Sequence, residues 1–150
     1  MELTPQDKEK LEELCAMSFD MARNNDHQSL KLLLENGLNV NLANHKGDTL
    51  LMLASYHNSI ECVKLLLTHK AEVDKVNDKN LTPLAGVCFK GYIEVAKLLL
   101  ENGANPDIKN PMGMSPYDFA IMFRRKEIIK LLQKYSNKKI GFFKRLWLRF

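Results

Sequence analysis

Tyr56 and His57 are adjacent ring side chains, and each type can ligate a metal ion or contact a partner. They end the stretch LLMLASYHNS, which begins as an apolar helix and turns polar. His45, His57 and His69 are evenly spaced along the sequence. Metal binding by all three would require separate elements to converge, and no acidic side chains accompany them to orient the rings. We therefore expect no dedicated metal site, and the role of the pair depends on its scaffold.

The sequence carries none of the usual catalytic patterns. A nucleophile beside a base, a glycine-rich phosphate loop and a carboxylate pair at defined spacing are all missing. We therefore expect a protein that binds other molecules and is not an enzyme.

The three cysteines, Cys15, Cys62 and Cys88, are odd in number and widely spaced, without a C-x-x-C motif. This pattern favours buried, reduced thiols over disulfides or zinc ligation. The N-terminal stretch, MELTPQDKEKLEELC, lacks the basic and apolar regions of a signal peptide. No apolar run approaches the roughly 20 residues that span a bilayer. These features predict a cytoplasmic protein.

A sequence repeat organises the chain, with a period of about 33 residues. KLLLENGLNVN from Lys31 recurs as KLLLTHKAEVD from Lys64 and KLLLENGANPD from Lys97, and a weaker copy starts at Lys130. The predicted repeats are 11–43, 44–76, 77–109 and 110–135, within a domain of residues 1–136. Their second helices should bury the leucine runs 32–34, 65–67 and 98–100 between layers.

These residues resemble the ankyrin repeat. The matching features are Thr82-Pro83-Leu84, Ser115-Pro116-Tyr117, the KLLL runs, Gly37-Leu38 and Gly103-Ala104. The resemblance implies an all-α solenoid of helix-turn-helix units with projecting loops and divergent terminal repeats. Thr or Ser before Pro is also a favourable helix start on physical grounds. Two positions where the family has glycine hold other residues, Lys70 at a helix end and Asn80 in a loop, and we expect a left-handed backbone at both. Residues 1–23 read as an acidic amphipathic N-terminal cap that starts at Thr4-Pro5.

Alignment of the repeats gives Tyr56 and His57 a position. Tyr56 aligns with Arg23, Phe89 and Met122, whereas His57 aligns with Asn24, Lys90 and Phe123. In the family these positions lie at the exposed end of the first helix. We therefore expect side chains displayed for binding, with basic flanks around aromatic and sulfur-containing groups. The alternative is that neighbouring repeats merely shield these rings. His27, in contrast, is expected in the core.

A second resemblance is to the small bacterial ankyrin proteins that accompany catalase and handle haem under peroxide stress. It implies that Tyr56 is an axial ligand of haem iron, with His57 as hydrogen-bond partner or substitute ligand. Phe89 and Met122 would then cover the macrocycle, and Arg23 and Lys90 would pair with its propionates. The competing interpretation is an adaptor that binds a protein partner and no small molecule.

The charge of the chain is divided unevenly. Residues 1–136 hold 17 Lys and Arg against 18 Asp and Glu, whereas residues 137–150 hold five cations and no acid. The near-neutral body argues against nucleic-acid binding. In the tail, NKKIGFFKRLWLRF, a helical wheel separates the aromatic from the basic residues. Two interpretations stay open: the tail covers the last repeat, or it docks on an anionic membrane surface or an acidic partner.

Overall fold

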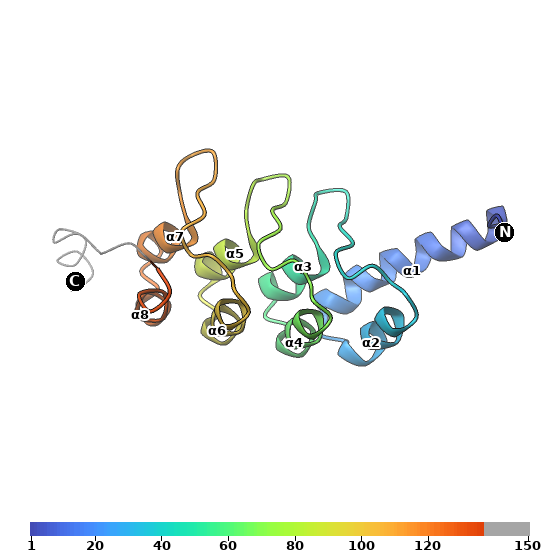
Figure 1. Ribbon diagram of the computed structural model, residues 1–150, viewed down its shortest axis with the longest axis horizontal. Coiled ribbons are helices and arrows are strands. Elements are labelled where there is room, and N and C mark those ends of the chain that lie inside the picture. The colour runs from blue at the N-terminus through green and yellow to red at the C-terminus, as the bar shows by residue number, and fades with distance from the viewer. Residues whose placement is uncertain (137–150) are drawn as a thin grey trace. The chain divides into compact units, whose positions relative to one another are not determined.

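The computed structural model describes residues 1–136, and within that range it contains helices and loops but no strand (Figure 1). An isolated antiparallel bridge joins Ala43 and Thr49 at the base of a loop. The predicted all-α fold is therefore confirmed for these residues, and both interpretations of the 137–150 tail concern residues outside them. The helices are α1 (Pro5–Arg23), α2 (His27–Glu35), α3 (Leu50–Tyr56), α4 (Ile60–Thr68), α5 (Pro83–Lys90), α6 (Ile93–Glu101), α7 (Pro116–Met122) and α8 (Lys126–Leu132).

The chain divides into two compact units, each built from two helix pairs. Unit 1 comprises Met1–Glu72, and in it α1 packs on α2 and α3, while α4 packs on α2 and α3. Unit 2 begins at Val73, and in it α5 packs on α6 and α7, while α8 packs on α6 and α7. The predicted repeats 44–76, 77–109 and 110–135 each contain one helix pair, whereas α1 begins at Pro5, ahead of the predicted first repeat 11–43. In both units long loops extend beyond the odd-numbered helices (Figure 1).

Hydroxyl side chains begin the odd-numbered helices, as the sequence predicts. Thr82 Oγ1 accepts a hydrogen bond from the Ala85 amide at 3.2 Å, and Pro83 occupies the first turn. Thr4 with Asp7 and Ser115 with Asp118 form reciprocal capping boxes. Such caps satisfy amide groups that have no partner inside the helix.

Left-handed residues lie at the predicted helix ends and at one predicted loop position. Gly37 and Gly103 have φ values of 99° and 92°. Lys70 and Asn80, which stand where the family has glycine, also have positive φ values, 64° and 56°. The backbone geometry of the repeat is thus kept even where its preferred residue is absent, at some conformational cost for the lysine.

An asparagine organises each projecting loop. Asn44, Asn77 and Asn110 occupy equivalent positions of successive repeats, and each side-chain oxygen accepts amides two and four residues further on at 2.9–3.1 Å. These side chains replace hydrogen bonds that a loop without regular structure would lack.

The core consists of apolar side chains at equivalent positions of the repeats. Leu66, Leu99 and Leu132 share one such position in successive repeats, and all three are fully buried. Around them, the odd-numbered helices contribute Leu50, Leu51, Leu84, Val87, Tyr117 and Ile121.

The prediction that residues 32–34 all lie in the core was wrong for Leu32. Its side chain is 62% exposed, whereas Leu34 is buried. The equivalent residue Leu65 is partly covered because α4 packs against the preceding α2. In the described structure α2 belongs to the first helix pair, so nothing precedes it on that side.

Leu66 and Leu32 provide a matched test of this core. Leu66→Ala should lower the free energy of unfolding by about 2–5 kcal/mol, because it leaves a cavity in a fully buried site. Leu32→Ala, in the same KLLL motif, should change it by less than about 0.5 kcal/mol. Urea denaturation measures both, and equal losses would contradict the assignment of the buried face.

Candidate functional site

The six residues predicted to form a site lie at the ends of the odd-numbered helices. Arg23, Tyr56 and His57 belong to unit 1, whereas Phe89, Lys90 and Met122 belong to unit 2. Tyr56, Phe89 and Met122 are exposed, and Arg23 is half-buried.

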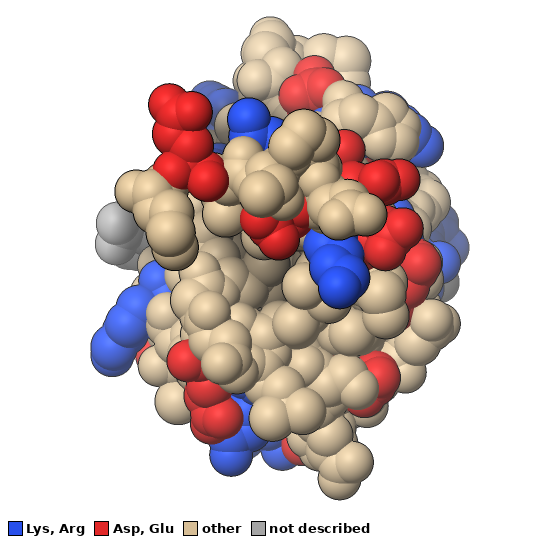
Figure 2. Space-filling view, turned by 90° about the vertical axis from the view of Figure 1, so that its right-hand side faces the viewer, with Lys and Arg blue, Asp and Glu red and all other residues tan. Residues whose placement is uncertain are grey.

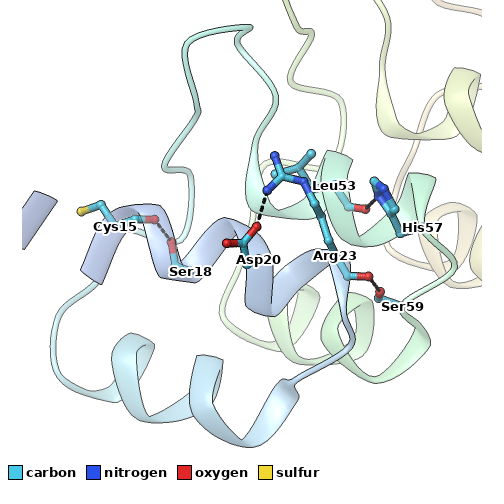
Figure 3. A network of polar contacts seen from close by, with 7 residues as sticks. All are labelled: Cys15, Ser18, Asp20, Arg23, Leu53, His57 and Ser59. Atoms are coloured by element: carbon cyan, nitrogen blue, oxygen red, sulfur yellow. Dashed lines mark hydrogen bonds and ion pairs between the residues drawn. The ribbon is translucent and has the colours of Figure 1, made fainter. Parts of the chain in front are cut away.

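In unit 1, a network of polar contacts fixes the end of α1 (Figure 3). The Arg23 guanidinium lies 2.8 Å from the Asp20 carboxylate, and the Arg23 carbonyl accepts a hydrogen bond from Ser59 Oγ at 3.0 Å. The Cys62 amide bonds to the Asn25 side chain at 3.0 Å. Arg23 is thus tied to the second helix pair through its backbone, and its guanidinium is engaged with an acid.

His57 follows the last residue of α3 and caps that helix. Its Nδ1 lies 2.9 Å from the Leu53 carbonyl, so the tautomer with a proton on Nδ1 leaves the Nε2 lone pair available. The Tyr56 and His57 rings meet edge to face at 5.9 Å. His69 caps α4 in the same way, with Nδ1 at 2.9 Å from the Leu65 carbonyl.

The prediction of a buried His27 was wrong. His27 is the first residue of α2 and is exposed. The equivalent Ile93 at the start of α6 is also 39% exposed, because the end of an outer helix extends beyond the packed layer. Residues 1–136 contain no cluster of three or more His, Cys, Asp or Glu side chains placed to hold a metal ion.

In unit 2, the connections between paired helices form a surface that we call the aromatic-basic surface, residues 89–93 and 122–126. The Phe89 and Phe123 rings meet edge to face at 4.7 Å and remain 40% and 37% exposed. The Lys90 ammonium lies 5.9 Å from the centre of the Tyr92 ring. The two segments contain four Lys and Arg residues and no acid.

Arg125 holds the two segments of the aromatic-basic surface together. Its Nη2 and Nε donate to the Phe89 carbonyl at 2.7 and 3.2 Å. The guanidinium also lies against Gly91, where an added Cβ would meet it at 3.0 Å, and Gly91 has a φ of 87°. Arg125 is 36 residues after Phe89, as Ser59 is 36 residues after Arg23, so the same backbone link recurs with a different donor.

A groove of about 530 Å³ lies in unit 1 beside α1, and we call it the α1 groove. Sequence reasoning did not predict it. Its walls come from α1 and from the tip of the first loop: Leu11, Glu12, Cys15, Ala16, Phe19, Asp20, Arg23, Asn44 and His45. The side of the molecule where α1 begins carries acidic side chains together with several Lys and Arg side chains, among uncharged ones (Figure 2).

The sequence of the chain matches a family model of ankyrin repeats in three copies over residues 18–110 and 77–141. The chain belongs to the ankyrin-repeat family. An ankyrin repeat protein of Pseudomonas aeruginosa, PA3287, is 64% identical over 39 residues, which cover 26% of this chain and 23% of the relative. This match spans about a quarter of either ankyrin-repeat protein. It therefore supports the assignment of the repeat and gives no information about the binding partner of this chain.

Ankyrin repeats generally act as scaffolds for protein-protein contacts, which agrees with the exposed surfaces of both units. Among residues 1–136, no helix combines the length and the apolar character that crossing a membrane requires.

Burial suppresses the acidity of two cysteines in this ankyrin-repeat chain. Burial raises the pKa of the Cys88 thiol to about 12. Burial, followed by the negative charges of Asp26 and Glu61, raises the pKa of Cys62 to about 11, and its Sγ lies 3.6 Å from the Met21 carbonyl. Cys15 is partly exposed in the α1 groove.

These thiols should differ in reactivity. The thiolate is the reactive form, and a raised pKa reduces its fraction near neutral pH. At about pH 8, an alkylating reagent should therefore modify Cys15 in the folded chain and leave Cys62 and Cys88 intact. Mass spectrometry locates the modification, with denatured protein as the control in which all three react. Fast modification of Cys88 in the folded protein would contradict its placement in the core.

Proposed function

We propose that this chain is a non-enzymatic binding protein whose aromatic-basic surface holds an acidic, aromatic-containing segment of a protein partner. The observation that carries the proposal is the exposed Phe89–Phe123 pair, with its ring centroids 4.7 Å apart, on two segments that contain four cations and no acid.

Two physical features of this surface favour a protein partner. Partly exposed aromatic rings next to arginine are typical of the residues that dominate binding energy in interfaces. Cations around the rings attract acidic segments at long range and raise the rate of encounter. The surface is also firmly positioned, because Arg125 fixes the backbone of Phe89.

A random copolymer of glutamate and tyrosine is a suitable probe, and fluorescence anisotropy of the labelled copolymer measures its affinity for the full chain. Lys90→Glu combined with Lys126→Glu should weaken binding about tenfold, because it reverses two charges on the surface. The control is Lys97→Glu with Lys109→Glu, which changes the net charge equally at exposed positions elsewhere in unit 2.

The control separates a local from a general charge effect. It should weaken binding much less, since its charges lie away from the aromatic pair. Equal losses in both double variants would show that the copolymer responds only to net charge, and would contradict the proposed surface.

A second candidate function, haem binding, is favoured by two adjacent potential iron ligands, Tyr56 and His57, whose rings meet edge to face at 5.9 Å. With His57 Nδ1 held at 2.9 Å from the Leu53 carbonyl, the imidazole ring is oriented and Nε2 is the atom that could ligate iron. Tyr56 adjoins it as the other predicted ligand. The Arg23 guanidinium is less suited to a propionate, since it lies 2.8 Å from Asp20. The resemblance to haem-handling ankyrin proteins suggests, for this second candidate, a bacterial accessory of catalase with iron held by Tyr56 or His57.

His69 is a matched control for this second candidate. In titrations with ferric haem followed by visible absorption, His57→Ala should abolish or alter the ligand-specific spectrum if His57 binds iron, and Tyr56→Phe should do so if Tyr56 does. His69→Ala removes an equivalent helix cap and should leave the spectrum intact. A spectrum that is the same in all variants would remove Tyr56 and His57 as ligands.

A further inference from the structure

We propose that the α1 groove of one copy binds residues 137–150 of a second copy. This inference goes beyond the proposed function, since it concerns other residues and a different occupant.

Helix α1 is unusually long. It has 19 residues, whereas α3, α5 and α7 have seven or eight. Only its second half contributes buried residues, Ser18 and Ala22. Leu11, Leu14 and Met17 precede them and are exposed, on a helix that extends past α2 (Figure 1), and of these three Leu11 lines the α1 groove. Exposed apolar side chains on such an extension indicate a surface that is completed by a partner.

The α1 groove is lined by both apolar and charged side chains. Leu11, Cys15, Ala16 and Phe19 supply apolar side chains, Glu12 adds a carboxylate, and the Asp20 carboxylate is paired with the Arg23 guanidinium at 2.8 Å. Its volume of about 530 Å³ falls among pockets of about 300–1,000 Å³ that bind compact ligands. The site is therefore suited to apolar side chains from a segment that also carries positive charge.

The α1 groove and the tail are complementary in charge. Residues 1–23, through the end of α1, hold six acidic side chains, two lysines and Arg23. Residues 137–150 hold five cations and no acid, together with seven large apolar residues. The tail thus matches the groove in both respects, with apolar groups for the floor and cations for the carboxylates around it.

A second copy is a more suitable source of the tail for the α1 groove than the same chain. The groove is part of the first helix pair, and the tail follows the last one. In repeat proteins each repeat contacts only its neighbours along the chain, so a tail that follows the last repeat is expected to meet the first-repeat groove of a second copy more readily than that of its own chain. A second copy brings the tail to the groove without any rearrangement of the repeats. Two copies could exchange tails reciprocally, which closes a dimer.

The full-length chain offers a reporter on each side of this contact. Trp147, the sole tryptophan, lies in the tail, and the partly exposed Cys15 lines the groove. As the protein concentration rises, the Trp147 emission should shift to the blue and the alkylation of Cys15 should slow, while sedimentation velocity shows association. Raising NaCl from about 0.05 to about 0.5 M should reverse all three changes, because salt screens the opposite charges.

Charge reversal tests the groove itself. Glu12→Lys with Asp20→Lys should raise the concentration needed for association about tenfold or more. The matched control is Glu35→Lys with Glu61→Lys, which makes the same change in net charge at exposed positions of α2 and α4, and it should associate almost as the unmodified chain does.

Three results would overturn the proposal. A blue-shifted Trp147 emission that does not depend on concentration would place the tail on its own chain. An emission that shifts only when vesicles containing anionic lipid are added would make a membrane the occupant of the tail. Equal effects of the two charge-reversed variants would show that the α1 groove is not the binding site of the tail. None of these variants alters the aromatic-basic surface, so their outcome is independent of the copolymer test.

Discussion

Each helix pair must bury its apolar faces against a neighbouring pair, and this constraint explains most of the structure. Leu66, Leu99 and Leu132 occupy the same place in successive repeats and are fully buried. A single pair cannot cover both of its faces, so stability arises between pairs. Where no neighbour is present, apolar side chains stay exposed, as Leu32 on α2 and Leu11 on α1 show. The same constraint therefore produces the core and the surfaces left for partners.

The links between repeats fix the backbone of the displayed residues and leave their side chains variable. A donor 36 residues further on binds the carbonyl at the end of α1 and of α5, from Ser59 to Arg23 and from Arg125 to Phe89. Because these contacts use the backbone, the side chain at that position does not affect them. The ankyrin scaffold can thus present an arginine in one repeat and a phenylalanine in another with the same support.

Structural features that recur in every repeat could be predicted well from the sequence. Features that depend on the ends of the repeat array could not. The period of the repeat, the threonine and serine caps and the left-handed backbone at Lys70 are local features, so they could be predicted. The recurrence of asparagine at 44, 77 and 110 was a readable signal of the loop structure that sequence reasoning did not use. The exposure of Leu32 and the α1 groove follow from missing neighbours, and a pattern of residue types does not contain that information. Prediction of the helix cap formed by His57 would have required the position of its ring. That position depends on the side-chain rotamer, which the sequence does not give.

We propose that side chains at the ends of the odd-numbered helices serve binding and not folding. The most direct test compares the free energy of unfolding in urea for the full-length double variant Tyr56→Ala with Met122→Ala and for Leu84→Ala, whose side chain is fully buried. We expect the loss in free energy of unfolding of the double variant to be less than about half of the loss caused by Leu84→Ala, because the double variant removes exposed groups and creates no cavity. A double variant as destabilised as Leu84→Ala would contradict it, since these side chains would then belong to the core.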